Sequence, residues 1–196
     1  MVWGDHTRKA VVLAVVTLTF AGLSGCASQG GGATHDGAGA NSTLTLAQTK
    51  SPVQLLRNEA ADRLDEFVVE TVNETEDLSV ACKTEKADPL GLERSWVSSV
   101  DVSLKEGSAW RVAIMADELV ASFEAQGWVA SRGAPSAVTY TGLKSETSAA
   151  TIGLTVTTED LAAGTPAKLQ ITSKGPCVMT AGAQSDEIAK LETKTQ

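Results

Sequence analysis

The side chains that could carry acid–base chemistry in this chain are carboxylates rather than histidines. Both histidines, His6 and His35, precede the segment in which we expect a folded domain. Their position argues against Ser-His-Asp and Cys-His catalysis and against histidine-containing zinc or iron sites. Paired carboxylates could still bind calcium or act as acid and base, but they fall on polar helix faces or in a turn. We therefore expect solvated surface acids and no catalytic, cofactor-binding or metal-binding residue; the pairs are Asp62 and Asp65, Asp117 and Glu118, and Glu159 and Asp160.

The strongest chemical signal is the thiol of Cys26 in the run Leu23-Ser24-Gly25-Cys26. This run is typical of a bacterial lipobox, where the leader is cut before the cysteine and the thiol receives a diacylglycerol. A polar segment with two positive charges precedes an apolar run at residues 10–22. Those thirteen residues would rise only about 20 Å as a helix against roughly 30 Å of hydrocarbon, so they do not suit a permanent span. We expect residues 1–25 to be a signal peptide and Cys26 to be lipidated, with an ordinary secretory signal as the alternative.

Acylation of this thiol would fix the location of the protein. One acyl chain binds a membrane only marginally, at about 0.8 kcal/mol per buried methylene, whereas two or three chains dissociate slowly. Residues 26–50 would then form a lipidated N-terminus and a flexible linker, because they are rich in glycine, serine, threonine and alanine. We expect a protein anchored to the cell membrane through this lipid and facing outside the cytoplasm.

The charge of the chain argues against nucleic acid as a partner. The chain carries 16 basic and 24 acidic residues. Loss of residues 1–25 would remove two basic and one acidic residue, which leaves a net charge of −9. Phosphate-backbone binding depends on clustered Lys and Arg, and no such cluster occurs in the remaining sequence.

The two other cysteines, Cys82 and Cys177, form an even pair in an expected exported and oxidising setting. A structural disulfide is the natural interpretation. The alternative is a redox or metal site, which would need a neighbouring thiol, as in C-x-x-C, or histidine ligands, and the sequence of the expected domain offers neither.

Hydrophobic periodicity predicts one folded domain at residues 51–179, followed by a flexible tail at residues 180–196. Ser51 as N-cap, Pro52 and Gln54 mark the start of a first helix, and apolar residues at spacings of three and four extend its stripe to Val72. Gly107-Ser108 opens a second helix that ends before Gly127. Alternating residues predict strands at 78–83, 94–104, 137–143, 151–157 and 168–173, with a brief strand at 129–131.

This order predicts an α+β fold in which two helices pack on one face of a twisted antiparallel sheet of about five strands, α-β-β-α-β-β-β. Trp96, Trp110 and Trp128 bracket the second helix. Three indoles in that position could line a ligand groove between helix and sheet. Core packing, or exposure at a helix end, is the more frequent use of such residues.

Residues 51–178 resemble a group of small exported proteins of actinobacteria, many of them lipoproteins without an assigned activity. The resemblance rests on a helix, a cysteine-bearing strand, a second helix ending in Ala125-Gln126-Gly127-Trp128, and a meander closing on Gly175-Pro176-Cys177. It implies this architecture, an envelope location and a bridge between Cys82 and Cys177, and it carries over no catalytic residue. Lys174-Gly175 before the proline departs from the group's Ser-Pro-Cys-like ending.

These expectations favour a membrane-anchored extracytoplasmic lipoprotein that acts as a non-enzymatic binding or accessory protein of the cell envelope and needs no cofactor. Its partners would be the membrane, reached through the covalent lipid, and an envelope protein or an apolar ligand. One alternative is a carrier of apolar ligands or lipids with a pocket between helices and sheet. The other is an envelope enzyme that works without histidine.

Overall fold

Alternating apolar and polar residues produce seven strands in the part of the chain that the computed structural model describes, residues 44–160, 162 and 164–193. All strand pairs are antiparallel, in the order β1-β2-β6-β5-β4-β3, and β7 pairs with one end of β2. Cys26 and the expected signal peptide lie outside the described residues. The strands are β1 (Val69–Ala81), β2 (Glu93–Leu104), β3 (Val129–Arg132), β4 (Val138–Lys144), β5 (Thr151–Thr157), β6 (Lys168–Lys174) and β7 (Val178–Met179).

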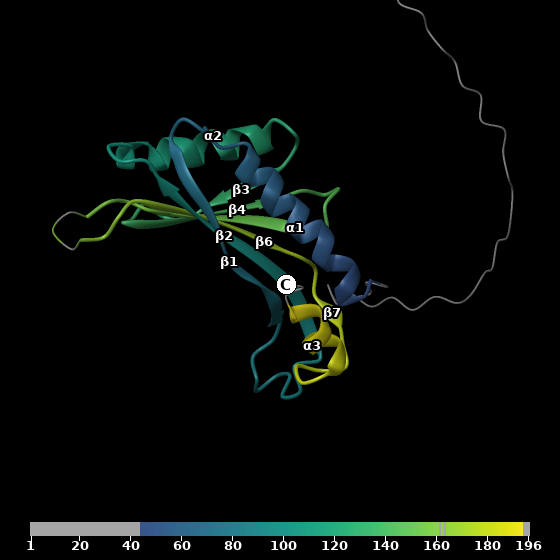
Figure 1. Cartoon of the computed structure of the whole chain (residues 1–196). Helices are drawn as coiled ribbons and strands as arrows, with labels where there is room; N and C mark the ends of the chain where they lie inside the picture. The colour runs from purple at the N-terminus through teal and green to yellow at the C-terminus, as the bar shows by residue number, and fades with distance from the viewer. Residues whose placement is uncertain (1–43, 161, 163, 194–196) are drawn as a thin grey trace, which may run out of the picture. The chain divides into compact units, whose positions relative to one another are not determined.

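Two helices, α1 (Leu46–Asp62) and α2 (Val112–Glu124), cover one face of this sheet (Figure 1). α1 packs on β2 and β6, whereas α2 packs mainly on β5 and β3. The alternation of the strands directs one set of apolar side chains toward the helices and leaves mostly polar ones on the other face. The buried core joins the two layers through Val53, Leu56, Met115, Leu119 and Phe123 of the helices and Trp96, Val100, Ile152, Leu154, Leu169 and Ile171 of the strands.

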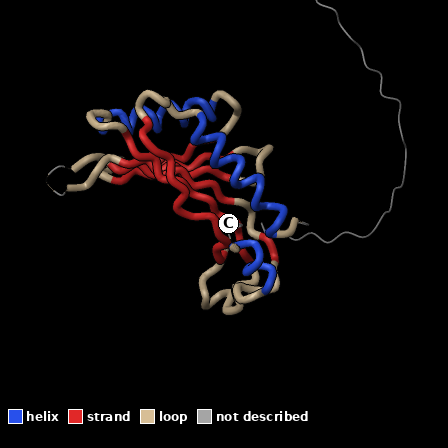
Figure 2. Tube along the Cα trace, viewed as in Figure 1, coloured by secondary structure: helices blue, strands red, loops and turns tan. Residues whose placement is uncertain are grey.

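The structure confirms the α+β class, the antiparallel sheet and the two helices on one face of it. It contains more elements than expected, namely seven strands and, within the described residues, a third α-helix (Figure 2). The second helix and the strands at 94–104, 129–131, 137–143, 151–157 and 168–173 lie within a few residues of their predicted positions. A short 3-10 turn, η1 (Ala109–Arg111), leads into α2, and Gly127 just beyond the helix adopts φ +86°.

The first helix begins earlier than predicted. Its N-cap is Thr45, whose side chain accepts from the backbone N–H of Gln48, while the Gln48 side chain accepts from the Thr45 N–H at 2.8 Å. Pro52 therefore lies inside the helix, where its missing N–H costs roughly 3 kcal/mol. The extra turns offset this cost because they bury Leu46 completely and Thr49 almost completely. The predicted start at Ser51 is thus wrong, and residues 46–50 of the expected linker are helical.

The first helix also ends earlier than predicted, at Asp62. The Asp65 side chain accepts from the backbone N–H of Phe67, and the Asp65 carbonyl accepts from Val68 and Val69, so the chain turns here into β1. Val72, assigned to the helix from its spacing, belongs to this strand. The predicted strand at 78–83 is the last part of β1, which forms a long hairpin with β2.

The expected flexible tail contains ordered structure. Helix α3 (Asp186–Glu192) starts at the N-cap Ser185 and buries Ile188. The Glu192 carboxylate accepts from the backbone N–H and the hydroxyl of Ser79 in β1, at 2.9 and 2.7 Å. The sequence after Thr180 predicts weak helicity at residues 185–191 together with fraying; the helix is confirmed, and the fraying is wrong for residues 186–192. Among the helices of the described residues, none is long and apolar enough to cross a bilayer.

Candidate functional site

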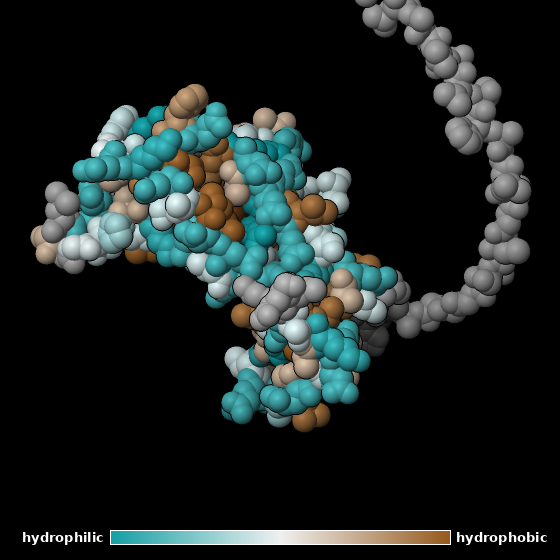
Figure 3. Space-filling model, in the orientation of Figure 1, coloured by the Kyte–Doolittle hydropathy of each residue, from teal (hydrophilic) through white to brown (hydrophobic). Residues whose placement is uncertain are grey.

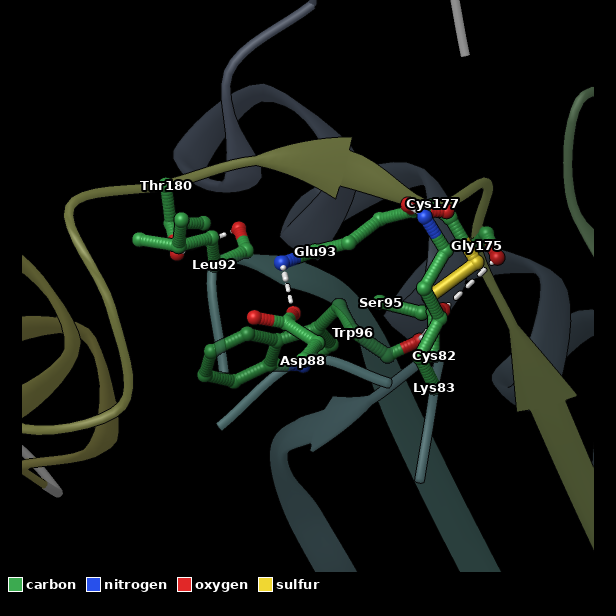
Figure 4. The surroundings of a disulfide bond; sticks show 10 residues. All are labelled: Cys82, Lys83, Asp88, Leu92, Glu93, Ser95, Trp96, Gly175, Cys177 and Thr180. Atoms are coloured by element: carbon green, nitrogen blue, oxygen red, sulfur yellow. Dashed lines mark hydrogen bonds and ion pairs between the residues drawn. A yellow bond between two sulfur atoms is a disulfide. The ribbon is translucent and has the colours of Figure 1, made fainter. Parts of the chain in front are cut away.

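The disulfide predicted from the two paired cysteines is present. Cys82 lies directly after β1 and Cys177 lies between β6 and β7, with their Cα atoms 6.1 Å apart (Figure 4). The backbone N–H of Cys82 donates to the Glu93 carbonyl at 2.9 Å, and the Ser95 hydroxyl donates to the Gly175 carbonyl at 2.7 Å. The bridge therefore ties the end of the β1–β2 hairpin to the segment that leads into β7 and α3.

The alternative of a metal site at these cysteines does not fit the geometry. The sulfur atoms and a Glu93 carboxylate oxygen lie within 4.8 Å of one another. The two sulfur atoms are bonded to each other, so neither is a thiolate that could coordinate a metal. The Glu93 carboxylate instead pairs with the Lys83 ammonium at 2.6 Å. The arrangement is a structural disulfide beside a surface ion pair.

Two charged groups next to this bridge have shifted pKa values. The hydrogen bond and charge of Glu93 raise the pKa of Lys83 above its ordinary value. The backbone N–H groups of Glu93 and Leu92 lower the pKa of Asp88, and the first of them donates to the Asp88 carboxylate at 2.8 Å. Both shifts stabilise the charged forms of exposed groups that hold the β1–β2 connection in place.

The carboxylate pairs considered from the sequence do not converge on a site. Asp117 pairs with Arg132 at 2.7 Å. Asp65 pairs with Arg111 at 3.3 Å and also holds the turn before β1. The remaining members, Asp62, Glu118, Glu159 and Asp160, are exposed. The sequence predicts solvated surface acids: five of the six residues are exposed, whereas Asp65 is partly buried and ion-paired.

The three tryptophans do not line one groove. Trp96 is completely buried, and its indole N–H donates to Asp77 at 2.8 Å. Trp110 is 71% exposed on η1. Trp128 packs edge-to-face on Phe123, with ring centroids 5.2 Å apart. Only Trp128 of the three lies at the groove described next.

A groove of about 450 Å³ runs between α1 and the connection from β4 to β5. Its floor is made of buried side chains, including Val53, Leu56 and Ala150. One wall is an exposed stripe of α1 that runs through Gln48, Pro52, Leu55 and Glu59. The other wall is formed by the β4–β5 connection with Trp128 and Pro176. Hydrophobic residues appear at the surface beside α1 among mostly hydrophilic neighbours (Figure 3). The remaining lining residues are Leu44, Thr49, Thr147, Ser148 and Ala149.

Sequence reasoning missed this groove. Two of its exposed apolar residues, Leu44 (42% exposed) and Leu55 (68%), stand outside the buried stripe of α1. Leu44 precedes the helix and Leu55 lies within it. Both line one surface because the helix starts at Leu46, which places Leu44 at the N-terminal end of the same helix face. Leu55 was the available signal, since it is a large apolar residue on the otherwise polar side of the helix.

A buried arginine joins α1 to the β1–β2 hairpin. Arg57 is 8% exposed, and its guanidinium donates to the Ser98 hydroxyl at 2.8 Å and pairs with the Glu74 carboxylate at 2.9 Å. These contacts satisfy the buried charge and fix the position of α1 over β2. Arg57 therefore sets the position of the groove wall without lining the groove.

No protein-family model, curated protein or solved structure matches this chain.

Proposed function

We propose that this protein is an extracytoplasmic lipoprotein, anchored in the cell membrane through Cys26, that binds an apolar component of the envelope and does not catalyse a reaction. The run Leu23-Ser24-Gly25-Cys26 after an apolar stretch supports the anchor. The disulfide between Cys82 and Cys177 agrees with an oxidising compartment outside the cytoplasm.

The observation that carries the binding function is the apolar groove beside α1. Its volume of about 450 Å³ lies within the range of roughly 300–1,000 Å³ that is common for small-molecule sites. Polar side chains, such as Gln48 and Thr147, also line the groove, while its buried residues are apolar except Thr49. This arrangement suits a ligand held by burial of hydrocarbon rather than by charge.

Metabolic labelling of the full chain with an alkynyl palmitate tests the anchor. The expected result is a label on the mature protein that is lost in Cys26→Ser and retained in the double variant Cys82→Ala/Cys177→Ala. Intact mass should show a chain that begins at Cys26 with a diacylglycerol. A label that persists in Cys26→Ser, or a mature chain that lacks lipid, would contradict the proposal.

A further inference from the structure

We propose that the groove beside α1 holds one acyl chain of a phospholipid from the bilayer to which the protein is anchored. The inference rests on the proposed function and adds the ligand class and its source. Three properties of the groove support it: its length, the chemistry of its lining and its position relative to the N-terminal segment.

The groove is long enough for a hydrocarbon chain. Its lining extends from Leu44, just before α1, to Glu59 near the end of the helix, which is about 22 Å at the helical rise of 1.5 Å per residue. This length exceeds the roughly 15 Å that each leaflet contributes to a 30 Å hydrocarbon core, so an extended acyl chain can lie along the groove.

The walls of the groove argue against an added β-strand as the occupant. An added strand needs a free sheet edge, whereas one wall is a helix whose backbone groups are bonded within it. An acyl chain requires no hydrogen-bonding partner.

The lining is chemically suited to a hydrocarbon. The exposed Leu44 and Leu55 and the partly buried Trp128 form apolar walls above the buried floor. Glu59 is the charged residue of the lining, and it is neutralised by an ion pair with Arg63. The lining contains no Lys or Arg, so the groove offers no counter-charge for a phosphate headgroup. The headgroup would therefore stay outside while the chain is buried.

The groove also begins at the N-terminal end of the described residues. Leu44 lines one end of the groove and is separated from Cys26 by seventeen residues. Even fully extended, eighteen residue steps span at most about 65 Å. Acylation of Cys26 would thus confine the groove to the neighbourhood of bilayer lipids, where their local concentration is high.

A photo-crosslinking experiment on the full chain tests this inference. Host cells are fed a diazirine fatty acid, illuminated, and the purified protein is digested for mass spectrometry. We expect phospholipid adducts on peptides that contain Leu55, Trp128 or Ala149. Leu55→Glu should lower the adduct yield about tenfold, because it removes apolar contact and places a carboxylate against the chain. Ala149→Phe, which narrows the groove without adding charge, should lower the yield as well.

Leu90→Glu is the matched control, because Leu90 and Leu55 are both 68% exposed and Leu90 does not line the groove. Its adduct yield should equal that of the unchanged protein. Near-UV circular dichroism and an intact disulfide would show that each variant is folded. Equal yields in Leu55→Glu and Leu90→Glu would overturn the proposal.

The cross-linked products also distinguish a failure of the acyl-chain site from a failure of the lipid anchor at Cys26. Lipidated Cys26 without adducts in the groove would refute the acyl-chain site and leave the anchor standing. Adducts in the groove of a chain without lipid at Cys26 would refute the anchor and retain the site. A cross-link between the groove and the peptide of Cys26 would overturn the bilayer source, because the bound chain would then be the protein's own.

Discussion

Removal of the disulfide should lower the stability of the domain by an amount that its loop length defines. The bridge closes a sequence separation of 95 residues, for which the chain-entropy estimate gives about 4.7 kcal/mol at 25 °C. Single domains are stable by only about 5–15 kcal/mol, so the loss is a large fraction of the total. With a urea m-value of about 2 kcal/mol/M, the unfolding midpoint of Cys82→Ala/Cys177→Ala should fall by roughly 2 M.

The structure also predicts which part of the domain loosens first. β7 joins the sheet through two residue pairs with β2, and α3 contacts the domain through a few side chains such as Ile188. Without the bridge, the segment from Pro176 onward loses its covalent link to the hairpin. Amide hydrogen exchange in residues 186–192 should therefore accelerate more than exchange in β5.

Urea unfolding followed by tryptophan fluorescence measures the first effect, with Cys26→Ser as the common background. Ser103→Ala, a change at an exposed residue of β2, is the control and should leave the midpoint within about 0.3 M. Wild-type protein treated with a reductant should behave like the double variant. A midpoint shift below about 0.5 M, or unchanged protection of residues 186–192, would refute this account of the bridge.

Three further predictions follow from single contacts. Thr45→Ala should reduce the free energy of unfolding by about 1 kcal/mol through loss of the helix cap, whereas Ser51→Ala should be nearly neutral in the same urea titration; the reverse order would restore the start predicted from the sequence. Arg57→Met should cost about 2 kcal/mol in thermal or urea unfolding, because it leaves the buried Ser98 hydroxyl without this donor, and no loss would show that the guanidinium is not needed there. The pKa of Asp88 is lower in the folded than in the unfolded protein, so its ionisation stabilises the fold at pH values above the unfolded pKa, and this stabilisation is lost as the pH falls through the folded pKa. NMR titration should show a pKa below that of a free aspartate. Asp88→Asn should make the free energy of unfolding depend less on pH in acid.

The strands after α2, and α2 itself, could be predicted because their patterns are local. β6 alternates buried and more exposed residues along its length, and α2 repeats its buried positions at spacings of three and four. The glycine beyond α2 marked the end of that helix. In these segments, periodicity and turn residues point to the same structure.

The errors occur where two local signals compete or where distant contacts decide. Thr45 with Gln48 and Ser51 with Gln54 both match the capping-box pattern in the sequence, and the burial of Leu46 favours the first. The first half of β1 is almost entirely exposed and lacks an apolar alternation that would mark it as a strand. The seven-residue α3 is held by side chains from other elements, such as Lys50, which donates to the Leu191 carbonyl at 2.6 Å.

The candidate site was predictable only in part. The pairing of Cys82 with Cys177 followed from cysteine number and the expected compartment, and the structure confirms it. The groove depends on the approach of α1 to residues 147–150, which lie almost a hundred positions later in the chain. The spacing of residues in the sequence does not predict this long-range contact. Trp128 could therefore be proposed as a pocket residue, while the groove residues of α1 and residues 147–150 could not.

Native mass spectrometry of the protein, extracted from its host membrane in lipid nanodiscs, measures the lipid anchor and the groove ligand in one spectrum. We expect a chain that begins at Cys26, carries a covalent diacylglycerol, and retains one phospholipid that dissociates at high collision energy. The retained phospholipid should disappear in Leu55→Glu and persist in Leu90→Glu. A chain without lipid on Cys26, and without any retained phospholipid, would contradict the account.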